Sequence, residues 1–106
     1  MKHTKSMVYK PSVESCELFL YTVNNGDLYE YMTSPIIENL KKKAKKGVYD
    51  SQKAIDIYYN LATAGSKAYY KDFGYSFSVQ DRFTCAVDME NYYKDEVFWE
   101  LANVTM

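Results

Sequence analysis

The chain has 106 residues, of which 47% are hydrophobic and 25% are charged, so it is long enough for one domain with a hydrophobic core. This composition excludes a disordered tail, a collagen-like chain and a linker, and no run of 18 apolar residues predicts a membrane span. The formal net charge of −1 excludes the overall basic charge of a typical nucleic-acid-binding domain and the strong acidity of a DNA mimic.

The first twelve residues are polar and contain Pro11 near their end, which predicts a flexible arm over residues 1–12. No apolar stretch follows the positive charges of this arm, so we expect no signal peptide and a cytoplasmic protein. The rest of the sequence contains no repeat, no low-complexity segment and no boundary of a second domain. We therefore expect residues 13–106 to form a single helical domain.

Residues 16–23 (CELFLYTV) are the first apolar segment. Their β-branched and aromatic side chains allow a short strand, whereas Cys16, Phe19 and Leu20 have the spacing of one helix face. Both alternatives stay open. The turn residues at positions 24–27 (NNGD) predict the end of this element.

Two helices are predicted between the turn and Gly47. Asp27 caps the first, which is short and carries Leu28, Tyr31 and Met32. Ser34 is a favourable N-cap for the second helix, and Pro35 suits its first position, where a missing N–H costs nothing. A single helix kinked at Pro35 is the alternative. The apolar positions of the second helix fall on one face: Ile36, Ile37, Leu40 and Ala44.

A longer helix is predicted next. It starts at Asp50 or Ser51 and ends near Asp72, with Gly74 past its end. Its apolar residues recur every three to four positions over a broad band. Three small residues on this helix allow another backbone to approach closely: Ala62, Gly65 and Ala68.

The last predicted helix begins at Ser78, which with Asp81 resembles a capping box, and reaches about residue 100. The elements together predict a mainly α fold. We expect a small three-helix bundle with a short N-terminal strand or helix and a flexible N-terminal arm.

Neither a catalytic group nor a metal site is indicated. His3 is the single histidine and lies in the predicted arm, which lacks the rigid surroundings that orient a general base. The spacing of Tyr49 and Lys53 matches the acid–base pair of short-chain dehydrogenases, but the chain has no GxGxxG turn. Cys16 and Cys85 are expected to be free, buried thiols, and a disulfide requires a fold that brings them together. We expect neither enzymatic activity nor a cofactor.

Charge is distributed unevenly. Residues 41–46 read KKKAKK, whereas residues 81–100 contain six acidic and two basic residues, a balance of 2 − 6 = −4. Acidic residues in this segment, such as Asp88 and Glu90, are one or two positions apart and therefore do not share a helix face. This spacing predicts solvated side chains rather than a catalytic pair. Such a bipolar layout can orient a partner or a second copy of the chain.

The chain also contains 12 tyrosines, a residue type enriched at protein interfaces because it combines a large ring with a polar tip. Tyr49 follows the lysine cluster and could stack on a base. One candidate partner-binding surface comprises Lys41, Lys42, Lys45, Lys46 and Tyr49, and a second comprises Tyr29 and Tyr31.

Several short sequence motifs resemble those of a family of small uncharacterised bacteriophage proteins. The most typical are Asn-Gly-Asp-Leu-Tyr at residues 25–29 and Lys-Gly-x-Tyr-Asp at residues 46–50, and the similarity covers roughly residues 17–100. The resemblance implies a phage or prophage origin and action in the bacterial cytoplasm. It implies no chemistry.

A small phage protein without a catalytic constellation is expected to bind a component of the host. Our leading hypothesis is a stoichiometric inhibitor or modulator of a bacterial process, such as CRISPR or another nuclease-based defence. The alternative is a small nucleic-acid-binding accessory protein that uses the cluster from Lys41 to Lys46. The opposite charges and the aromatic residues also allow a homodimer.

Overall fold

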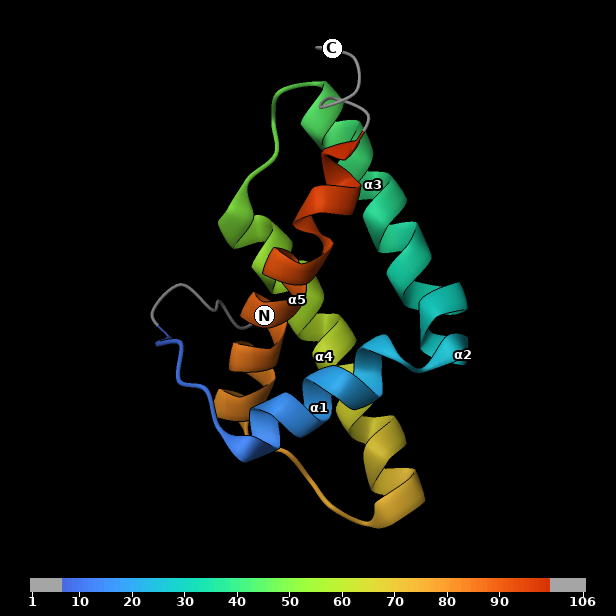
Figure 1. Ribbon diagram of the computed structural model, residues 1–106, viewed down its shortest axis with the longest axis vertical. Coiled ribbons are helices and arrows are strands. Elements are labelled where there is room, and N and C mark those ends of the chain that lie inside the picture. Colours follow the sequence, from blue (N-terminus) through green and yellow to red (C-terminus); the bar gives the residue numbers. More distant parts are fainter. Residues whose placement is uncertain (1–6, 100–106) are drawn as a thin grey trace.

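The computed structural model describes residues 7–99, which are mainly helical and contain no strand (Figure 1). In chain order the elements are α1 (Val13–Val23), α2 (Gly26–Leu28), the π-helix η1 (Tyr29–Thr33), α3 (Ser34–Lys45), α4 (Ser51–Phe73) and α5 (Val79–Val97). The predicted mainly α class is confirmed, with α3, α4 and α5 as the three main helices. Figure 1 shows α4 and α5 crossing each other at an angle near the centre of the molecule, α1 crossing both lower down, and α3 beside the C-terminal half of α5.

The ambiguous segment 16–23 belongs to α1, because a capping box starts a helix just before it. Ser12 Oγ accepts a hydrogen bond from the Ser15 N–H at 2.9 Å, and the Ser12 N–H donates to Ser15 Oγ at 2.9 Å. The Ser12 hydroxyl also donates to Asp81 Oδ1 at 3.0 Å, which ties the start of α1 to the first turn of α5. The N-terminal element is therefore a helix.

The described part of the predicted arm, residues 7–12, lies extended along α5. The Lys10 N–H donates to Thr84 Oγ1 at 3.1 Å, and Gln80 Nε2 donates to the Val8 carbonyl oxygen at 2.7 Å. This part of the arm is thus anchored to the domain. The expected flexibility of residues 1–6 lies outside the described residues.

A continuous helical path runs from α2 through η1 into α3, so the kinked-helix alternative describes this region. Asn25, rather than Asp27, is the N-cap, since its side chain accepts from the Leu28 N–H. Ser34 has helical backbone angles and its N–H donates to the Tyr29 carbonyl five residues earlier, so it is not an N-cap. In a regular α-helix, a proline ring clashes with the carbonyl group four residues before it. The turn just ahead of Pro35 is a wider π turn, which relieves this clash, so the helix continues through Pro35.

The other helix ends follow their local signals. After α3, Gly47 has φ 74°, the Val48 N–H donates to the Lys43 carbonyl at 2.9 Å, and the Gly47 N–H donates to the Ala44 carbonyl at 3.1 Å, which is a complete Schellman motif. The predicted start and end of α4 and the predicted start of α5 are confirmed: Asp50 and Ser78 are N-caps, and Gly74 has φ 73°. α5 ends at Val97, before the predicted end near residue 100.

α1 and α4 approach each other closely where they cross. A Cβ added at Gly65 would overlap the Thr22 side chain, so any larger residue at this point of α4 requires Thr22 to shift. The crossing closes one side of a core built from residues of all the long elements. Its most deeply buried large side chains are Leu18, Ile37, Leu40, Tyr58, Leu61 and Met89.

Candidate interaction surfaces

The lysine cluster lies at the C-terminal end of α3. Lys42, Lys45 and Lys46 are exposed, and because they are three and four residues apart they share one side of the helix, away from the buried Leu40 and Ala44. We call these three residues the lysine face. The Schellman motif at Gly47 fixes the backbone on which it is presented.

The other two lysines of the cluster are less exposed. Lys41 Nζ lies 3.5 Å from Glu38 Oε2 on the preceding turn. Lys43 is half-buried and lines a small hollow with Asp50 and Lys53. The structure therefore divides the cluster, and the outward part of it is the lysine face.

The Tyr49 side chain is packed against the domain and does not add an open aromatic surface to the lysine face. Its ring packs edge-on against Phe98, with centroids 4.9 Å apart, and its hydroxyl donates to Glu90 Oε2 at 2.7 Å. Burial, followed by the hydrogen bond to Glu90, raises the pKa of the Tyr49 phenol. This ring joins the loop after α3 to α5 and is not free to stack on a base.

The expectation that Asp88 and Glu90 both lie on a solvated helix face is wrong for Glu90. Glu90 is buried, and its Oε2 atom accepts from Tyr49 and from Ser51 Oγ at 3.2 Å, while Lys94 Nζ lies 3.2 Å away. The sequence held a signal for this position, because Glu90 follows the helical spacing of the apolar residues of α5.

Tyr29 and Tyr31, the second candidate surface, are both exposed, with 40% and 78% of their surface accessible. They lie on the π-helical segment at the opposite end of the same helical path from the lysine face. Eleven residues separate Tyr31 from Lys42, which corresponds to roughly 16 Å along a helix. The two candidate surfaces are therefore separate regions, and the structure does not bring them together.

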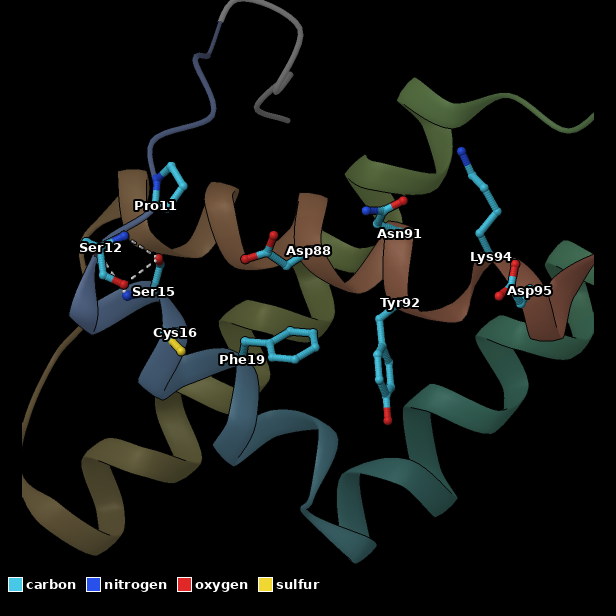
Figure 2. A pocket seen from close by; sticks show the side chains of 10 residues that line it. All are labelled: Pro11, Ser12, Ser15, Cys16, Phe19, Asp88, Asn91, Tyr92, Lys94 and Asp95. Atoms are coloured by element: carbon cyan, nitrogen blue, oxygen red, sulfur yellow. Dashed lines mark hydrogen bonds between the residues drawn. The ribbon is translucent and has the colours of Figure 1, made fainter.

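A groove between α1 and α5, with a volume of about 580 Å³, was not predicted (Figure 2). Phe19 and Tyr92 form an edge-to-face pair in it, with centroids 5.3 Å apart. Its lining residues are Pro11, Ser12, Ser15, Cys16, Phe19, Asp88, Asn91, Tyr92, Lys94 and Asp95. Nothing local in the sequence indicates this groove, because its two walls are about 70 residues apart in the chain.

The two cysteines have different environments. Cys85 is buried, as expected, and burial raises the pKa of its thiol. Cys16 is exposed on the groove, which corrects the expectation that both thiols are buried. Both are free.

A second aromatic region, which no sequence pattern indicated, lies where α4 ends. Tyr69 is in ring contact with Tyr21, Phe73, Tyr75 and Phe77. The Tyr21 hydroxyl donates to Asp72 Oδ2 at 2.7 Å, and this hydrogen bond is the main reason that the pKa of Tyr21 is raised. Phe73 and Tyr75 remain exposed, so this cluster adds apolar area to the surface.

Within residues 7–99, no three His, Cys, Asp or Glu side chains are grouped so that they could hold a metal ion. Among the helices described, none combines the length and apolarity needed to cross a membrane. Comparison of the chain with protein-family models, with curated proteins and with solved structures gives no significant match.

Proposed function

We propose that this chain acts by stoichiometric binding to a bacterial host protein or nucleoprotein, as an inhibitor or modulator, and not by catalysis. The observation that carries the proposal is the lysine face: three cationic side chains on one side of a helix end whose backbone is held by a Schellman motif. A surface on fixed backbone loses less conformational entropy on binding than one on a mobile loop.

The chemistry of this surface favours an acidic patch as its target. Lys42 and Lys46 are exposed and one helical turn apart, so both can contact the same anionic region. Binding there would occlude the target. The resemblance to bacteriophage proteins favours a target in the bacterial cytoplasm, and a nuclease-based defence such as CRISPR is the most concrete one.

Affinity capture from bacterial lysate, followed by mass spectrometry, tests this proposal. Lys42→Glu combined with Lys46→Glu should abolish recovery of the partner. Lys67→Glu combined with Lys71→Glu is a matched control, because it also reverses two exposed lysines one turn apart, on α4. Equal recovery with both double variants would show that the lysine face is not the binding surface.

Nucleic acid is the second candidate, because phosphate groups would also satisfy the lysine face. An electrophoretic shift assay at two salt concentrations separates the candidates. A shift at low salt that disappears at high salt would favour nucleic acid. The packed position of Tyr49 supports the protein target, since the ring expected to stack on a base is held by Phe98 and Glu90.

A further inference from the structure

We propose that the groove between α1 and α5 is a docking surface for an arginine-bearing basic segment of a protein partner, an inference that rests on the proposed binding function. It adds to the lysine face a second contact region of opposite charge. Its walls come from Cys16 and Phe19 on α1 and from Asp88, Tyr92 and Asp95 on α5 (Figure 2).

Charge selects a cationic occupant. Asp88 and Asp95 are two helical turns apart on α5, a spacing of about 10 Å, so both line the same side of the groove. The single lysine of the lining, Lys94, has its Nζ 3.2 Å from the buried Glu90 carboxylate, which offsets its charge. The groove therefore presents a negative potential to a partner.

The carboxylates of the groove differ in how firmly they are held. Asp88 Oδ1 accepts a hydrogen bond from the Tyr9 hydroxyl at 2.7 Å, which orients the Asp88 carboxylate from the anchored segment before α1. This hydrogen bond is also the main reason that the pKa of Tyr9 is raised. Asp88 is thus a pre-oriented acceptor, and Asp95 is a second acceptor nearer the end of α5.

The rings select arginine over lysine. Figure 2 shows the Phe19 ring extending from α1 toward the part of α5 that carries Asp88 and Tyr92, and Tyr92 is largely exposed. A planar guanidinium can stack on an aromatic ring and bind a carboxylate through two hydrogen bonds at once. A lysine ammonium lacks this planar shape, so the same groove holds it less well.

The outer side of α1 extends the groove with apolar surface. Val13 and Leu20 are exposed, and together with Pro11 and Cys16 they line a shallow hollow that adjoins the groove. An amphipathic segment could place its apolar side chains here and its arginines against Asp88 and Asp95. The surface thus fits a basic protein segment better than a free polyamine, which has no apolar side chains.

Cys16 provides a reporter for occupancy in the unmodified chain. It is exposed on the groove, whereas Cys85 is buried, so alkylation by uncharged iodoacetamide under native conditions occurs at Cys16. The probe is the peptide Ala-Arg-Ala-Ala-Arg-Ala with blocked ends. In the polyproline II conformation, which has three residues per turn, its two arginines lie on one side about 9 Å apart. At a peptide concentration of about twice its Kd, alkylation should slow about threefold, since a third of the grooves stay empty.

Two comparisons define the specificity. The same peptide with lysines should protect Cys16 less, and the peptide with glutamates should not protect it. Asp95→Asn should reduce protection by the arginine peptide, while Glu96→Gln removes the same charge one position away, at an exposed residue that does not line the groove. Backbone amide shifts of the folded variants, measured with and without peptide, should change along α1 and α5 in the Glu96→Gln chain but less in the Asp95→Asn chain.

Three results would overturn the proposal. The first is equal protection of Cys16 by the arginine and glutamate peptides, and the second is an equal decrease of that protection in the Asp95→Asn and Glu96→Gln variants. The third is slower alkylation of Cys16 when the protein concentration is raised without peptide, which would assign the groove to a second copy. The lysine-face double variant should bind the peptide normally. A failure of peptide binding at the groove can therefore be distinguished from a failure of the lysine face to bind the proposed target.

Discussion

The hydroxyl of Tyr49 donates a 2.7 Å hydrogen bond to the carboxylate of Glu90, across 41 positions of sequence. This bond joins the loop that follows α3 to the middle of α5, and Ser51 and Lys94 complete the surroundings of the same carboxylate oxygen. A buried carboxylate is costly unless hydrogen bonds and a counter-charge compensate it. Tyr49 is therefore a structural partner of Glu90.

Replacing Tyr49 by phenylalanine should destabilise the fold. The ring contact with Phe98 remains, but Glu90 loses one of its donors in a buried site, which costs about 1–3 kcal/mol of the free energy of unfolding. Urea unfolding followed by circular dichroism measures this change. Tyr31→Phe is the control, because that side chain is exposed and its loss should change stability by no more than about 0.5 kcal/mol.

Replacing Gly65 by alanine should also destabilise the fold, because the new Cβ overlaps the Thr22 side chain where α1 crosses α4. Overpacking of this kind costs about 1–3 kcal/mol. Adding Thr22→Ala should recover part of that loss, so a double-mutant cycle should show coupling between the two positions. Gly26→Ala is the control, since a Cβ there meets no atom within 4 Å; a cost equal to that of Gly65→Ala would contradict the close crossing.

Stability should be lost at alkaline pH. Burial is the main cause that raises the pKa of Tyr49, Tyr58, Tyr93 and the Cys85 thiol in the folded chain. Because the unfolded forms ionise at about pH 8.5 for cysteine and about 10 for tyrosine, the stabilisation is complete below these values and falls as pH rises through them. The urea midpoint should be constant between neutral pH and about pH 8, and should decrease steadily above it.

Tyrosinate absorbance provides the check on the alkaline prediction. The buried tyrosines, Tyr58 and Tyr93, should ionise only with the loss of helical signal. Ionisation of Tyr58 and Tyr93 before the loss of helical signal would contradict their burial.

Thiol chemistry should separate the two cysteines. In native buffer, Cys16 should be alkylated and Cys85 should be protected, because one side chain is exposed and the other is buried. In concentrated urea both should react. Cys16→Ser should remove the native reaction, whereas rapid modification of the remaining thiol in that variant would show that α5 opens locally.

The sequence alone determined the helical class, both ends of α4 and the start of α5, because caps act between residues no more than about five positions apart. Asp50, Gly47, Gly74 and Ser78 each carry such a signal and each behaves as it predicts. Ser34 shows the limit of this reasoning: its N-cap signal competes with a helical path that is continued by the π turn before Pro35.

The exposure of the lysine face also follows from helical spacing, since Leu40 and Ala44 fix the buried side of α3. The roles of Tyr49 and Glu90, and the groove that joins Cys16 and Phe19 to the carboxylates of α5, were decided only by the tertiary structure. These sites depend on how α1 and the loop after α3 pack on α5. Such contacts between distant segments arise from burying the core as a whole, and no short sequence pattern encodes them.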